Sequence, residues 1–170
     1  MRLATIGHWL YRRAENILAL MLAVMFLSFL AQIIFRYILN LPIGWTSELT
    51  VVMWLWLVLW GAAFVVREEE EIRFDLVYGG VGPRARRIMA ILSALALLGL
   101  YLLSLPAVWD YVTFMKVQST AYMKIRFDFL FSIYVIFAVA AIGRYGFILW
   151  KALFGRAPKE FDPTKASSGV

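Results

Sequence analysis

The sequence predicts an all-α membrane protein with four transmembrane helices. Four apolar runs are each long enough, as a helix, to cross a hydrocarbon core of about 30 Å. Hydrophobic residues make up 63% of the 170 residues and charged residues only 16%, whereas soluble domains average about 45–50% and about 25%. The chain also holds 7 Trp, 8 Tyr and 13 Phe, which suits the aromatic belts of membrane proteins.

The predicted spans are apolar along nearly their whole length. The fourth span holds one charge, Arg144, which can either snorkel to the cytoplasmic interface, the interpretation we favour, or meet an acceptor on a partner. No small-x-small cleavage site follows the first run, so we expect it to remain as an anchor and not to be removed as a signal peptide. The spans cover about residues 17–38, 49–66, 88–108 and 129–150.

Basic residues are distributed unevenly around these spans. The N-terminal arm, the second loop and the C-terminal tail together carry 12 Lys and Arg, whereas the opposite side carries 4. The positive-inside rule therefore predicts that both termini are cytoplasmic. The same rule accounts for the net charge of +6 without a nucleic-acid partner. The four basic residues on the outer side are Arg36, Lys116, Lys124 and Arg126.

The pattern predicts a single four-helix transmembrane domain over residues 1–156 and a disordered cytoplasmic tail over 157–170. The segment between the second and third spans has two interpretations. Its apolar residues can form a short interfacial helix, or the segment is a solvated charge run supported by an i,i+4 pair of Glu69 and Arg73. The apolar residues concerned are Ile72, Phe74, Leu76 and Val77.

The composition argues against several kinds of chemistry. The chain has no Cys and a single His, His8, which excludes disulfides, thiol nucleophiles, Cys-based metal sites and bis-His haem. All 11 acidic residues lie outside the spans or at their edges, so the chain lacks the intramembrane carboxylate expected of a self-sufficient ion-coupled carrier. We therefore expect no catalytic, cofactor or metal site, and we interpret the chain as a scaffold or partner subunit.

The hairpin between the first two spans carries opposite charges. Glu48 lies in the first turn of the second helix, where the helix dipole favours an anion. Arg36 ends the first span on the same side of the membrane. An ion pair between them across the hairpin is feasible and would lower the cost of placing both charges near lipid. The alternative, which we favour, is that Glu48 is buried against a partner, because it lies on the outer side beside Trp45, an amphipathic anchor suited to interfaces.

The second span combines large aromatic and small residues. Trp54 and Gly61 are seven apart and share a face, and a glycine lets a neighbouring helix approach closely. Whether that helix belongs to this bundle or to another subunit stays open. Trp56 and Trp60 lie on another face, where we expect them to touch lipid.

A series of short motifs runs from the end of the first span to the start of the third. They are Arg36-Tyr37, Pro42, Trp45-Thr46-Ser47-Glu48, Trp54, Gly61, Arg67, Ile72-Arg73-Phe74-Asp75 and the basic entry to the third helix, Pro83-Arg84-x-Arg86-Arg87. In their order and spacing they resemble the Q-type (DctQ-like) small membrane subunit of tripartite ATP-independent periplasmic (TRAP) transporters. The close match covers residues 36 to 75, and the second half of the chain agrees mainly in hydropathy. One position departs from the pattern, because Glu71 stands where the family often has a histidine.

In such systems a soluble periplasmic protein captures an organic acid, and a large polytopic subunit imports it with a sodium gradient. The resemblance implies that this chain is the small accessory subunit in the bacterial inner membrane, supporting the large subunit and the docking of the binding protein. Sodium coupling would lie in the large subunit, and this chain would hold no cofactor. The implied structural or interface residues are Arg36, Trp45, Glu48, Trp54, Gly61, Arg67, Arg73 and Asp75.

Three other functions compete with this interpretation. A free-standing four-helix transporter is disfavoured by the absence of membrane acids. A membrane-embedded enzyme or redox subunit is disfavoured by the single His and the lack of Cys. The third alternative is an unrelated structural or assembly protein of the membrane.

Overall fold

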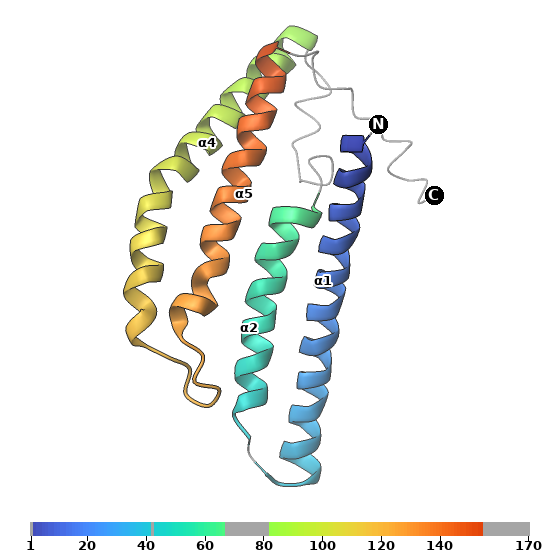
Figure 1. The fold of residues 1–170 in the computed structure, drawn as a ribbon, viewed down its shortest axis with the longest axis vertical. Coiled ribbons are helices and arrows are strands. Elements are labelled where there is room, and N and C mark those ends of the chain that lie inside the picture. Colours follow the sequence, from blue (N-terminus) through green and yellow to red (C-terminus); the bar gives the residue numbers. More distant parts are fainter. Residues whose placement is uncertain (1, 42, 67–81, 155–170) are drawn as a thin grey trace. The chain divides into compact units, whose positions relative to one another are not determined.

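A computed structural model describes residues 2–41, 43–66 and 82–154, which are helical apart from short connections (Figure 1). Each of the four main helices contains a stretch long and apolar enough to cross a membrane. No strand occurs within these ranges. The prediction of an all-α protein with four transmembrane helices is therefore confirmed. The helices are α1 (Arg2–Ile33), α2 (Trp45–Trp60), α4 (Pro83–Phe114) and α5 (Phe127–Phe154).

The helices extend beyond the apolar runs of the sequence. Once a helix is nucleated each added residue gains a hydrogen bond, so polar flanks can continue it. α4 accordingly runs past Pro106 to Phe114. Two π-helical segments, η1 (Ile34–Ile38) and η2 (Gly61–Val65), follow α1 and α2, and the short 3-10 segment η3 (Met115–Val117) follows α4. The predicted interfacial segment with Glu71 and the predicted tail from 157 lie outside the described residues.

The chain divides into two compact units. Unit 1 comprises residues 1–67 and 104–140, and unit 2 comprises 68–103 and 141–170. In unit 1, α1 packs along α2 and η2 (Figure 1).

In unit 2, an arginine of α4 binds the C-terminal end of α5. The Arg87 guanidinium donates hydrogen bonds to the carbonyl oxygens of Ala152 (2.7 Å) and Leu153 (2.5 Å). The rings of Tyr101 and Tyr145 stack with their centres 5.9 Å apart.

The buried core of the described residues is small. In each candidate span only 6% to 17% of the most apolar window is buried, and many large apolar side chains are exposed. Most of each helix surface is therefore available to lipid or to another protein. The core contains the fully buried Ile133 and is otherwise rich in alanine, which lets helix backbones approach closely. The buried alanines are Ala14, Ala90, Ala94, Ala138, Ala141 and Ala152.

Candidate functional site

The candidate site is one end of unit 1, where the α1–α2 hairpin (residues 34–48) meets the loop that leads into α5. We call residues 118–126 the α5 entry loop. Both segments belong to the same compact unit. Five of the eight residues implied by the sequence are described, and the other three, Arg67, Arg73 and Asp75, lie outside the described residues.

Glu48 binds the α5 entry loop through both carboxylate oxygens. It lies in the first turn of α2, as predicted. Its Oε1 accepts a hydrogen bond from the backbone N–H of Tyr122 (2.8 Å), and its Oε2 accepts one from the N–H of Met123 (2.9 Å). A carboxylate that accepts backbone N–H groups forms charge-assisted hydrogen bonds, which are stronger than neutral ones. The loop is thereby tied to the start of α2, although the two segments are far apart in sequence.

Arg36 and Glu48 do not form the ion pair that the sequence made feasible. Among the described residues no ion pair joins these two side chains. Arg36 lies in η1, where its guanidinium carbon is 5.9 Å from the centre of the Tyr37 ring. The physical reason is that backbone amides of the α5 entry loop satisfy the Glu48 carboxylate in place of the guanidinium.

A close approach of Tyr122 to Gly44 adds to this contact. Gly44 is the residue immediately before α2. The Tyr122 ring occupies the space that a Cβ at Gly44 would need. The absence of a side chain at Gly44 therefore lets the tip of the loop lie against the hairpin.

The α5 entry loop is also closed by its own hydrogen bonds. At its base, the Phe127 N–H donates to the Gln118 carbonyl (3.0 Å), and the Thr120 N–H donates to the Ile125 carbonyl (2.9 Å). The Ile125 N–H donates in turn to the Thr120 hydroxyl oxygen (3.1 Å). Lys124 adopts a positive φ of 55°, a left-handed conformation that reverses the chain at the tip. The loop is thus a defined small hairpin.

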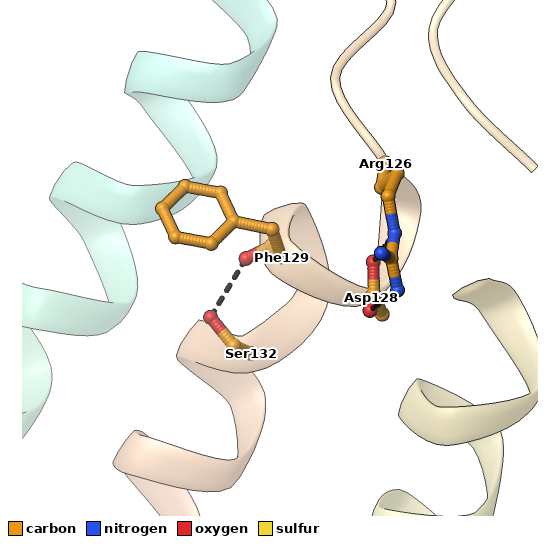
Figure 2. A network of polar contacts seen from close by, with 4 residues as sticks. All are labelled: Arg126, Asp128, Phe129 and Ser132. Carbon is orange, nitrogen blue, oxygen red and sulfur yellow. Dashed lines mark hydrogen bonds and ion pairs between the residues drawn. The ribbon is translucent and has the colours of Figure 1, made fainter.

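The charged start of α5 forms a local ion pair (Figure 2). Arg126 donates from Nε to one oxygen of Asp128 (3.1 Å) and from Nη2 to the other (2.6 Å). Figure 2 shows the Phe129 ring pointing away from this pair, toward α2. There it stacks on Trp56 with ring centres 5.9 Å apart. The Ser132 hydroxyl donates to the Phe129 carbonyl oxygen (2.7 Å) in the first turns of the helix.

Trp56 and Trp60 are half-buried, and each also bonds a neighbouring helix, which the expectation of lipid contact did not include. The indole N–H of Trp56 donates to the Leu130 carbonyl oxygen in α5 (3.0 Å). The indole N–H of Trp60 donates to the Ala14 carbonyl oxygen in α1 (3.2 Å). A buried indole N–H needs an acceptor, and neighbouring helix backbones supply one on each side. These two tryptophans link α2 to α1 and to the start of α5.

Of the remaining predicted residues, Gly61 packs against α1, whereas Trp45 and Trp54 are exposed. Gly61 is buried, and a Cβ built on it would lie 3.3 Å from Leu18 Cδ1 of α1. The close approach at Gly61 is therefore made by a helix of this chain. Trp45 is 42% exposed and Trp54 is 56% exposed. The structure leaves both side chains accessible to lipid or to another protein.

Sequence reasoning missed the α5 entry loop. The only signal was the unusual charge of residues 124–128 just before the fourth apolar run. The contact of Glu48 with Tyr122 and Met123 is made by backbone amides, which every residue type except proline has. Side-chain identity in the loop therefore gave no indication of the partner of Glu48.

Comparison with known proteins places the chain in a family. Residues 25–155 match the family model described as tripartite ATP-independent periplasmic transporters, DctQ component. The chain is 33% identical over 97 residues to a protein of Vibrio cholerae serotype O1 described as C4-dicarboxylate TRAP transporter small permease protein DctQ. That similarity covers 57% of this chain and 42% of the relative's length. With its four membrane-spanning helices, the chain belongs to the DctQ family of small permease subunits of TRAP transporters, multi-pass proteins of the bacterial inner membrane.

Proposed function

We propose that this chain is an accessory subunit that supports a large transport subunit and helps to dock a periplasmic binding protein during sodium-coupled uptake of an organic acid. The observation that carries the proposal is the surface of the helices, because between 83% and 94% of each span's apolar window is not buried within the chain. Such a surface suits packing against a larger membrane protein. Family membership supports the same assignment.

The proposal assigns transport itself to the large subunit. None of the 11 acidic residues lies within an apolar run. Among the described residues, no three His, Cys, Asp or Glu side chains gather where they could hold a metal ion. Intramembrane ionisable groups are what ion-coupled carriers normally use, so we assign sodium coupling to the partner.

The proposed substrate class comes from the description of the Vibrio cholerae relative. That protein is described as a C4-dicarboxylate transporter component, and we propose an organic acid as the cargo here. The binding protein and the large subunit would select the individual acid. This chain would contribute structure and, through the end of unit 1, a docking contact.

The test is co-purification. The tagged chain is expressed with the large polytopic TRAP subunit of the same organism, extracted in mild detergent and recovered by affinity. We expect both chains in one size-exclusion peak. A tagged chain recovered alone as a monodisperse protein, with the large subunit in a separate peak, would contradict the scaffold role.

A further inference from the structure

We propose that Glu48 is a positioning residue, which holds the α5 entry loop against the α1–α2 hairpin and so presents Tyr122 and Lys124 to the binding protein. The proposal rests on the docking role proposed above and assigns that role to a surface. Glu48 acts through the loop and does not itself contact the partner. Its two oxygens accept the N–H groups of Tyr122 and Met123 at 2.8 and 2.9 Å.

A carboxylate fits this position better than any other side chain. The two donors come from successive residues, and each carboxylate oxygen receives one of them. Glutamine offers one acceptor oxygen and one NH₂ donor, so one backbone N–H would face a donor. Aspartate keeps both acceptors but is one methylene shorter. The series Glu, Asp, Gln thus grades the strength of the contact without a large change in volume.

The base and the tip of the loop are held by different contacts. Gln118 and Phe127 pair at the base, and Thr120 pairs with Ile125. The backbone bonds are internal to the loop and its junction with α5, so they do not involve Glu48. The Thr120 hydroxyl, by contrast, also hydrogen-bonds the Glu48 carboxylate. Removing the carboxylate should release the tip from the hairpin and leave the loop and the helices folded.

The tip of the loop that Glu48 holds carries side chains that are suited to binding another protein. Tyr122 is 65% exposed, and Lys124 beside it is also exposed. Exposed tyrosines are common anchors at interfaces. In the described segment 115–128 the basic residues are Lys116, Lys124 and Arg126, and the Arg126 charge is paired with Asp128. Within the described part of the chain Lys116 and Lys124 have no ion-pair partner, which suits an acidic partner surface.

The first measurement tests the contact itself. In the complex with the large subunit, amide hydrogen exchange of residues 118–126 is measured by mass spectrometry for wild type, Glu48→Gln, Glu48→Asp and the matched control Asp110→Asn. Asp110 is an exposed acid of α4 in the same unit. We expect exchange at the tip to be roughly tenfold faster or more in Glu48→Gln, intermediate in Glu48→Asp and unchanged in Asp110→Asn.

The second measurement tests presentation to the partner. Tyr122→p-benzoylphenylalanine is introduced into the complex in proteoliposomes, and ultraviolet crosslinking to the purified TRAP binding protein of the same organism is measured. The control site is Leu103→p-benzoylphenylalanine, because Leu103 is 84% exposed within the apolar part of α4. We expect crosslinks from position 122 and none from 103. The yield from 122 should fall several-fold when Glu48→Gln is added.

The possible outcomes distinguish the positioning role of Glu48 from the docking of the binding protein. Unchanged exchange in Glu48→Gln would overturn the positioning role, whatever the crosslinks show. Faster exchange with an unchanged crosslink yield would also overturn it, because the tip would then dock without the contact. If position 122 fails to crosslink with native Glu48 in place although the binding protein binds the complex, the presentation of Tyr122 is overturned and docking uses another surface. If the binding protein does not bind the complex at all, the docking role fails and the proposal fails with it. Should Glu48→Gln not assemble, Glu48→Asp is compared with wild type by the same criteria.

Discussion

At the residue scale, two indole N–H groups link the helices of unit 1. Trp60 donates to a backbone carbonyl of α1 and Trp56 to one of α5. Inside a membrane, hydrophobic burial does not drive helices together, so packing and hydrogen bonds between helices contribute more of the association. Both bonds should therefore add measurably to stability.

Replacing Trp60 or Trp56 by Phe should destabilise the protein. Each change keeps an aromatic ring and removes one donor, at an expected cost of about 0.5–1.5 kcal/mol. The measurement is the heating temperature at which half of a fluorescently tagged protein leaves its size-exclusion peak. Trp54→Phe is the matched control, since Trp54 is 56% exposed. An equal loss in all three variants would show that ring size matters and the hydrogen bonds do not.

At the element scale, the contact between α1 and η2 depends on the small size of Gly61. The nearest atom to a Cβ at this position is the flexible end of Leu18, at 3.3 Å. Alanine should fit after a small movement of Leu18, whereas leucine would force the helices apart.

We expect Gly61→Ala to be near neutral, because alanine also favours the helix. Gly61→Leu should cost about 1–3 kcal/mol through overpacking. Gly143→Leu is the control, because among the described residues no atom beyond the local helix backbone lies within 4 Å of a Cβ there. The same heating assay checks both variants. A Gly61→Leu protein as stable as wild type would mean that α1 does not pack closely on η2.

The C-terminal end of α5 gives a second prediction at this scale. The last carbonyls of a helix have no partner within the helix, and Arg87 supplies donors to two of them. Arg87→Met should therefore increase amide hydrogen exchange in the last turn of α5, whereas Arg84→Met, at an exposed arginine of the same helix, should not. If both variants exchange like wild type, the Arg87 contact is not maintained in solution.

The elements themselves could be predicted from the sequence, but their contacts could not. Long apolar runs indicate membrane helices because the bilayer core has a fixed thickness, and the four helices were found on that basis. The partner of Glu48 was missed because it is a pair of backbone amides. The role of Trp56 and Trp60 was missed because helical periodicity gives the face of a residue but not what covers that face.

At the scale of the whole molecule, the orientation in the membrane is still a prediction. The distribution of 12 basic residues on one side and 4 on the other predicts cytoplasmic termini. Reporters fused near Ala85 and after Gly155 should therefore read cytoplasmic, and reporters near Ile43 and Val117 should read periplasmic. A periplasmic reading after Gly155 would contradict this topology.

The central claim is that this chain is required for transport but does not transport by itself. The most direct measurement is sodium-driven uptake of the acid bound by the binding protein, in proteoliposomes containing this chain, the large subunit or both, with the binding protein outside. We expect uptake only with both membrane chains present. Uptake by this chain alone, or full uptake by the large subunit without it, would contradict the accessory role.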